Sequence, residues 1–284
     1  MENFNDAERI GRHLVIIGGA EDRYNERRIL RKFVKLAGGK EARIVIVPVA
    51  SDYPEFSADV YTQAFRKLGL AHVAVLRATS RQEVMEVDAE ELLRDATGVF
   101  ISGGDQMRLA SVLGGTPFAR MLEGRVRACD IVLAGSSAGA AGMSATMIVR
   151  GDSGAHPHRS AVSLSPGLGV LQNIIVDQHF SERWRLSRLI TAVSYNPRQL
   201  GLGIDENTAV IISDDGMLEV HGHGTVTIVD GSRITYNDIA EVEDAQPFAV
   251  AGVQLHILRD GLQYDITRRR PIPVTEEFLL PDID

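Results

Sequence analysis

Short apolar runs rich in β-branched residues alternate with longer amphipathic segments through most of the chain. The runs predict strands at Leu14–Ile17, Arg43–Pro48, His72–Leu76, Gly98–Ile101 and Ile131–Ala134. Apolar residues at helical spacing predict helices at Glu26–Leu36, Phe56–Leu68, Arg81–Arg94, Gln106–Leu113 and Pro117–Ala128. This alternation is typical of an α/β fold with a doubly wound, mostly parallel sheet.

The pattern changes after Asp205. Turn sequences that contain Asp-Gly or His-Gly separate short β-rich segments, which are Ala209–Ile212, Leu218–His221, Thr225–Val229 and Gln254–Leu258. Such turns favour antiparallel hairpins. We therefore expect one domain over 1–284, with a core of about 12–212 and an antiparallel β extension of about 213–270.

Composition and charge narrow the classes of function. The 284 residues are 44% hydrophobic and 24% charged, and no apolar run has the roughly 20 residues that a membrane span requires. The net charge of −8 argues against a nucleic-acid partner or an anionic membrane surface. A single cysteine, Cys129, and no basic or apolar leader in Met1–Asp6 predict a cytoplasmic protein without disulfides.

The most informative motif begins at the end of the fifth predicted strand. The apolar run Ile131–Ala134 leads directly into Gly135-Ser136-Ser137-Ala138-Gly139, a G-x-S-x-G sequence followed by small residues. In a strand–turn–helix context this motif exposes its serine above the sheet. Ser137 is thus the candidate nucleophile, and the amide of Ala138 is a candidate donor to an oxyanion.

A serine nucleophile requires a base that is itself oriented by a carboxylate. His179 is the strongest candidate for the base, because it follows the apolar run Ile174–Val176 and so lies at a strand end, as Ser137 does. Another short apolar segment ends in Asp205-Glu206. Either carboxylate could orient His179, and the residues alone leave this choice open.

Two further glycine turns follow predicted strands. Backbone amides of Ser102-Gly103-Gly104-Asp105-Gln106, Gly104 in particular, could complete an oxyanion hole. Gly18-Gly19-Ala20-Glu21-Asp22 lacks both common phosphate-loop patterns, so nucleotide binding is a weak alternative. The pair His221 and His223 has no evident third ligand, and we expect neither a metal nor a cofactor.

With these residues in view, the sequence resembles the cyanophycinases, serine exopeptidases related to the aspartyl dipeptidase (peptidase E) group. The two glycine turns and the G-x-S-x-G motif carry the resemblance, together with Asp177–Leu189 and Gly203–Ala209. One departure is Arg23, which stands where lysine is expected. The resemblance implies a fold similar to class I glutamine amidotransferases and to flavodoxin.

The resemblance also implies the reaction. Carried over by position, it makes Ser137 the nucleophile, His179 the base and Glu206 the orienting carboxylate. The implied partner is cyanophycin, a poly-aspartate whose β-carboxyl groups each carry an arginine, and the implied products are β-Asp-Arg dipeptides. The resemblance further suggests a homodimer.

Several polar residues around these motifs are candidates for substrate binding. The guanidinium groups of Arg183, Arg185 and Arg188 suit carboxylates, although spacing along the predicted helix keeps the three from sharing one face. The side chains of Asp177 and Gln178 could receive guanidinium or amide groups, and Gln106 is a further candidate contact.

Three other interpretations compete with this one. A related serine dipeptidase would act on Asp or isoAsp peptides, but the arginine-bearing block after His179 and the β-rich last third of the chain favour the cyanophycinase type. A glutamine amidotransferase lacks its nucleophile, since Cys129 precedes the elbow strand. A non-catalytic binding relative is disfavoured because Ser137, His179 and Glu206 are all present.

Overall fold

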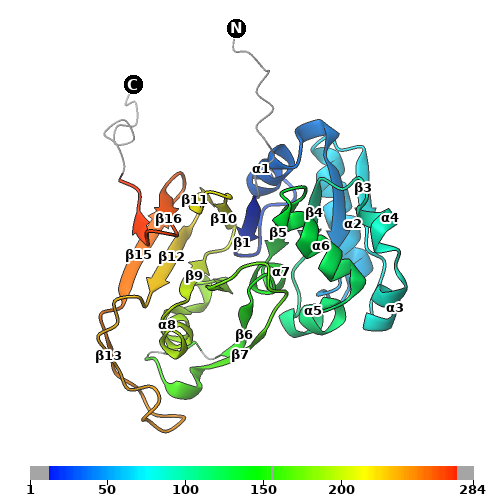
Figure 1. The fold of residues 1–284 in the computed structure, drawn as a ribbon. Coiled ribbons are helices and arrows are strands. Elements are labelled where there is room, and N and C mark those ends of the chain that lie inside the picture. The colour runs from blue at the N-terminus through cyan, green and yellow to red at the C-terminus, as the bar shows by residue number, and fades with distance from the viewer. Residues whose placement is uncertain (1–12, 152, 155, 274–284) are drawn as a thin grey trace, which may run out of the picture.

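The fold is described from a computed structural model for residues 13–151, 153–154 and 156–273, so the N-terminal segment used to infer localisation lies outside the described residues. Among these residues, nine strands form the main sheet (Figure 1). Five are mutually parallel, in the order β1-β5-β4-β2-β3. Their bounds are β1 Leu14–Ile17, β2 Arg43–Val47, β3 His72–Val75, β4 Gly98–Ile101 and β5 Val132–Ser136. The predicted parallel core is confirmed.

The remaining strands of this sheet continue beside β1 in antiparallel order β10-β11-β16-β17. They are β10 Thr208–Ile212, β11 Met217–Gly222, β16 Gln263–Asp265 and β17 Arg270–Pro271. β10 and β11 form the hairpin predicted from the Asp-Asp-Gly turn. Two of the four predicted β-rich segments, Ala209–Ile212 and Leu218–His221, thus extend the parallel sheet directly.

Helices cover both faces of the parallel part. On one face α1 (Arg28–Leu36) and α2 (Pro54–Lys67) bury Phe33 and Phe65 against Phe100. The other face packs against α5 (Gln106–Leu113) and α6 (Pro117–Arg127), next to the shorter α3 (Arg81–Glu86) and α4 (Ala89–Leu93). The doubly wound α/β class expected from the sequence is therefore confirmed.

A second, four-stranded sheet lies beside the main one, in the order β15-β12-β9-β8 (Figure 1). Its strands are β8 Ile174–Gln178, β9 Leu200–Ile204, β12 Thr225–Asp230 and β15 Gln254–Arg259, and α8 (Leu186–Tyr195) packs on it. The segments Thr225–Val229 and Gln254–Leu258 are strands as predicted but do not extend the main sheet. Gly222, with φ 146°, lets the chain leave β11 for this second sheet instead of closing a hairpin.

Shorter elements complete the description. β6 (Thr146–Gly151) pairs with β7 (Val162–Pro166), and β13 (Tyr236–Asn237) pairs with β14 (Val250–Ala251). The 3-10 helices are η1 Gly39–Glu41, η2 Arg159–Ala161 and η3 Ser181–Arg183, and α7 spans Ala138–Ala141. No helix within the described ranges has the length and apolar character needed to cross a bilayer.

Candidate active site

The G-x-S-x-G motif forms a sharp bend between β5 and α7. Ser137 has φ 50° and ψ −111°, a strained conformation that costs about 1–3 kcal/mol and is typical of functional turns. Both flanking glycines are required by close packing. A Cβ on Gly135 would lie 2.5 Å from the carbonyl oxygen of Gly139, and one on Gly139 would lie 2.3 Å from that of Ile101. The local fold is therefore that of a nucleophile elbow.

Three side chains form a continuous hydrogen-bonded chain at this bend. Ser137 Oγ lies 2.8 Å from His179 Nε2, and His179 Nδ1 lies 2.6 Å from Glu206 Oε1. His179 follows β8 directly, whereas Glu206 lies in the turn between β9 and β10. An imidazole in this position can accept the serine proton, while the carboxylate fixes its tautomer.

Asp205 serves a different purpose from Glu206. Its oxygens accept hydrogen bonds from the Ser181 amide at 3.0 Å and from the amide and hydroxyl of Thr225, both at 2.8 Å. The Glu206 amide in turn donates to Glu182 Oε1 at 3.1 Å. Asp205 thus holds the turn together, and Glu206 contacts His179.

Gly103 and Gly104 lie beside the nucleophile. A Cβ on Gly103 would be 3.3 Å from Ser137 Cβ, so the turn after β4 borders the serine. Gly104 has φ 147°, and a Cβ there would overlap the Ala50 carbonyl oxygen at 2.0 Å. Within the described residues, the amides of Gly104 and Ala138 donate to no protein acceptor. They are available to a developing oxyanion.

The loop after β1 supports the site in a way that the sequence did not reveal. The Gly18 carbonyl accepts a hydrogen bond from the His179 amide at 2.8 Å, and the Gly19 carbonyl accepts one from Asn207 at 2.8 Å. A Cβ on Gly19 would approach the His179 ring to 2.4 Å. The sequence block Gly-Gly-Ala-Glu-Asp was the signal that could have identified this supporting role, which is to pack against the imidazole.

The same loop places a buried carboxylate behind the nucleophile strand. Glu21, only 2% exposed, accepts hydrogen bonds from Ser136 Oγ at 2.5 Å and from the Tyr61 hydroxyl. Burial and the neighbouring Glu21 raise the pKa of Tyr61 well above its ordinary value, so its hydroxyl stays a donor. Ser136 therefore anchors the elbow, and its hydroxyl is not a second nucleophile.

Asp177, Arg185 and Arg188 form a buried ionic cluster. Arg188 donates to both Asp177 oxygens, through Nε at 2.7 Å and Nη2 at 2.5 Å, and Arg185 Nη1 lies 3.3 Å from Asp177 Oδ1. Burial lowers the pKa of Arg185 to about 10. These contacts join β8 with α8, while the enclosed Nε of Arg185 has no hydrogen-bond partner among the described residues. Contact of this cluster with substrate stays a prediction.

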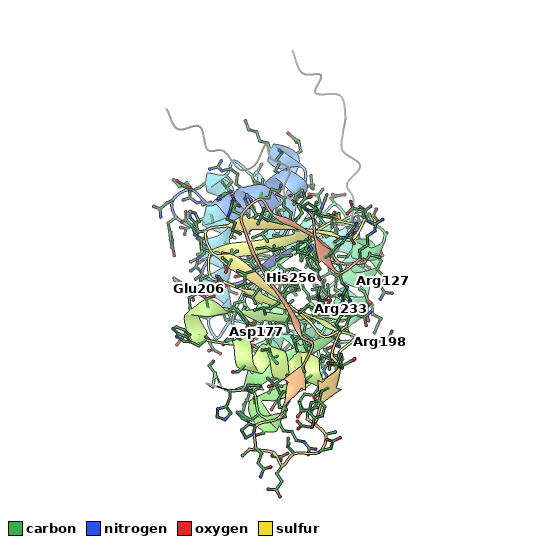
Figure 2. The ribbon with its side chains drawn as sticks, turned by 90° about the vertical axis from the view of Figure 1, so that its left-hand side faces the viewer. Arg127, Asp177, Arg198, Glu206, Arg233 and His256 are labelled. Atoms are coloured by element: carbon green, nitrogen blue, oxygen red, sulfur yellow. The ribbon has the colours of Figure 1, made fainter. Side chains whose placement is uncertain are left out.

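The other candidate substrate contacts differ in whether their side chains are already hydrogen-bonded within the protein. Gln106 Nε2 donates to the carbonyls of Ile148 and Val149, so its amide holds β6. Arg183 is exposed, and its guanidinium has no hydrogen-bond or ion-pair partner among the described residues. Gln178 is 7% exposed, and its side-chain amide has no such partner either. Figure 2 looks onto the four-stranded sheet and shows Glu206 and Asp177 at separate places on this side.

The described residues bring together no set of three or more His, Cys, Asp or Glu side chains suited to a metal ion. His221, one member of the His-x-His pair, instead has its Nδ1 3.6 Å from Asp260 Oδ1. Burial and the nearby Arg28 lower the pKa of His221, which favours the neutral imidazole.

Comparisons with known proteins agree with the fold and with the motifs. Two cyanophycinases are similar to this chain. The one from Geminocystis herdmanii is 40% identical over 259 residues, which is 91% of this chain and 95% of that protein. The one from a Nostoc species is 41% identical over 265 residues, covering 93% of this chain and 89% of that protein. The resemblance inferred from short motifs thus extends along the chain.

Solved structures agree at the level of the fold. A peptidase from an acI-B1 actinobacterium has a TM-score of 0.67 at 21% identity, over 89% of this chain and 96% of that one. A putative peptidase E from Listeria monocytogenes has a TM-score of 0.51 at 19% identity, covering 75% of this chain and 98% of that one. The model of peptidase family S51 matches residues 14–220. The chain therefore belongs to peptidase family S51.

Proposed function

We propose that this peptidase is a serine exopeptidase that hydrolyses cyanophycin to β-Asp-Arg dipeptides. The hydrogen-bonded chain from Ser137 through His179 to Glu206 is the observation that carries the proposal. Its substrate is suggested by the names of relatives that are about 40% identical over more than nine-tenths of the chain.

The mechanism follows from the roles of these groups. His179 Nε2 accepts the Ser137 proton while Oγ attacks a backbone carbonyl of the polymer, and the amides of Gly104 and Ala138 donate to the oxyanion. The imidazolium then gives this proton to the departing amine, leaving an acyl group on Ser137. Water, deprotonated by His179, attacks the ester; the acyl product leaves as a carboxylic acid, and the imidazolium returns the proton to Ser137 Oγ.

Arg183 and Gln178 are the proposed substrate contacts. Both lie close to the base in the sequence, and their polar side-chain groups form no hydrogen bond with other described residues. The Arg183 guanidinium suits a carboxylate of the arginyl groups, whereas the Gln178 amide can accept from a guanidinium and donate to a carbonyl.

Mass spectrometry of the soluble products from purified cyanophycin tests this function. Wild-type enzyme should release β-Asp-Arg, and Ser137→Ala should reduce the rate by about 10⁴-fold or more while preserving the fold. Ser111→Ala, on the exposed side of α5, is the matched control and should remain active. Cleavage of isoAsp dipeptides but not of the polymer would replace the proposal with a dipeptidase.

The proposal includes a homodimer in the cytoplasm. Light scattering of the purified protein should then give about twice the subunit mass of 31.0 kDa. A mass equal to one subunit would contradict the dimer without affecting the proposed chemistry. Fractionation of the source cells would test the location.

A further inference from the structure

Arg23 carries a guanidinium group that its own loop leaves unpaired. Two acidic residues precede it, but both carboxylates have other partners. Asp22 accepts hydrogen bonds from the amides of Tyr24 and Asn25, at 2.9 Å each, and from that of Arg27 at 3.0 Å. The oxygens of Glu21 accept from two hydroxyl groups. Neither acid forms an ion pair with Arg23.

Aromatic rings hold the Arg23 side chain in place. Its Cζ lies 5.7 Å from the centroid of the Tyr61 ring and 5.9 Å from that of Tyr24, within the range of cation–π attraction. Its Nε is enclosed and has no hydrogen-bond partner in the described part of the chain. An enclosed donor without an acceptor is destabilising, and a bound ligand with an acceptor would offset this cost.

A cation–π contact with Tyr61, followed by two hydrogen bonds, connects this guanidinium to the elbow. Tyr61, beneath Arg23, donates to Glu21, and Glu21 accepts from Ser136, the residue before the nucleophile. The same loop carries the Gly18 carbonyl that accepts the amide hydrogen of His179. Arg23 therefore lies in the loop that packs against the imidazole, four residues after Gly19, and its guanidinium lies next to the ring of Tyr61 in α2.

We propose that Arg23 binds a substrate carboxylate and so determines specificity, an inference that rests on the proposed function. A planar guanidinium can donate two parallel hydrogen bonds to a carboxylate, which a lysine cannot do. The polymer offers such groups in two places, namely on each arginyl side branch and at the carboxyl end of the backbone. Both have the same chemistry, and the test separates them.

The test uses short β-Asp-Arg oligomers in three forms: unmodified, with the arginyl carboxylates converted to amides, and with only the backbone terminus converted. Wild-type enzyme should prefer the unmodified oligomer over one of the amides. Arg23→Gln should raise KM for the unmodified oligomer about 10- to 100-fold, with kcat changed little, and should abolish that preference. The amide that the wild type rejects identifies the bound carboxylate.

Two variants distinguish this role from mere compensation of the Glu21 charge. Arg23→Lys preserves the charge but not the fork, so it should recover only part of the preference for a carboxylate. Arg66→Gln, an exposed arginine on the same helix as Tyr61, is the control and should leave KM unchanged. If Arg23 only balanced the charge of Glu21, Arg23→Lys would match the wild type in thermal stability and in its preference for the carboxylate oligomer. This result would overturn the inference.

Other outcomes are equally decisive. Equal use of all three oligomers by the wild type overturns the inference without any variant, while dipeptide release still supports the proposed function. Retention of the wild-type preference by Arg23→Gln also overturns it. If the wild type releases no dipeptide from any oligomer or from the polymer, the proposed function fails, and the assignment of Arg23 fails with it.

Discussion

Asp205 and Glu206 are adjacent carboxylates with different partners. The Asp205 side chain contacts Thr225 in the second sheet, and the Glu206 side chain contacts His179. The residues alone left this choice open, because it depends on how β8 lies next to β9, and the local pattern does not contain this pairing.

At the same scale, Gly19 limits the position of the imidazole. Its φ is 102°, and an added Cβ would lie 2.4 Å from His179 Cε1 and 2.6 Å from Nε2. Gly19→Ala should therefore displace the ring from Ser137 and lower kcat by about 100-fold, since a misplacement of about 1 Å has an effect of this size. Steady-state dipeptide release measures the loss.

Gly69→Ala is the matched control for this prediction. Gly69 has a similar φ of 93°, but nothing lies within 4 Å of an added Cβ. Both substitutions should destabilise the fold by about 1 kcal/mol through backbone strain, and only Gly19→Ala should lose activity. A wild-type kcat in Gly19→Ala would show that the ring has room to move.

Asp22 gives a prediction about pH. Hydrogen bonds from the amides of Asn25 and Arg27 lower its pKa well below the ordinary value of 3.8. Because the folded pKa is depressed, the ionised carboxylate stabilises the fold above pH 3.8, and this contribution is lost as the pH falls below it. Urea unfolding should therefore show Asp22→Asn less stable than wild type at pH 7, with the difference shrinking between pH 4 and pH 2.

At the scale of elements, the buried cluster distinguishes two of the three arginines after His179 from the third. A helix beside a strand end can direct arginines either inward or outward. Arg185 and Arg188 turn inward to Asp177, which is fully buried, and Arg183 stays outside in the 3-10 turn. The sequence showed that the three could not share a face, but it did not identify the inward pair.

This division predicts opposite effects for two substitutions. Arg188→Met leaves the Asp177 charge incompletely compensated and should reduce the free energy of unfolding by about 3–5 kcal/mol, with KM of the folded enzyme unchanged. Arg183→Met should change stability by less than about 0.5 kcal/mol but raise KM about 10-fold. Urea titration and steady-state kinetics on both variants would separate the roles, and the reverse pattern would contradict them.

Element boundaries were predictable where local signals agree. β1, β4 and α5 match the predicted ranges, since apolar runs or a capping Asp105 define their ends. The helix expected over Arg81–Arg94 is instead two helices. Ser80 caps α3. Asp88, whose side chain accepts a hydrogen bond from the Glu91 amide, caps α4 and starts a new helix within the predicted range.

At the scale of the whole molecule, the site lies where two sheets meet. Ser137 follows β5 in the main sheet, whereas His179 and Glu206 follow β8 and β9 in the second one. One hydrophobic core spans both sheets, from Val99 to Val226. The sequence predicted the strand ends that carry these residues. It did not predict the second sheet, because pairing between β9 and β12 depends on contacts that no local pattern records.

Gly18, which follows β1, packs against the backbone at the end of β9. A Cβ there would lie 2.1 Å from the Asp205 carbonyl oxygen and 2.5 Å from that of Ile204, and both are backbone atoms that cannot rotate away. Gly18→Ala should therefore separate the sheets at this point, destabilise the fold by about 2–3 kcal/mol and lower kcat of the folded enzyme about 100-fold.

Gly98→Ala is the control for this prediction, because it should disturb packing without changing the alignment of the two sheets. Its Cβ would meet the end of the Ile44 side chain at 2.6 Å, within the main sheet and away from the junction. This variant should lose about 1–3 kcal/mol of stability, yet its folded fraction should keep the wild-type kcat. Active-site titration with a serine-directed phosphonate would count the folded sites in each variant. If folded Gly18→Ala also kept the wild-type kcat, the junction of the sheets would not set the distance between Ser137 and His179.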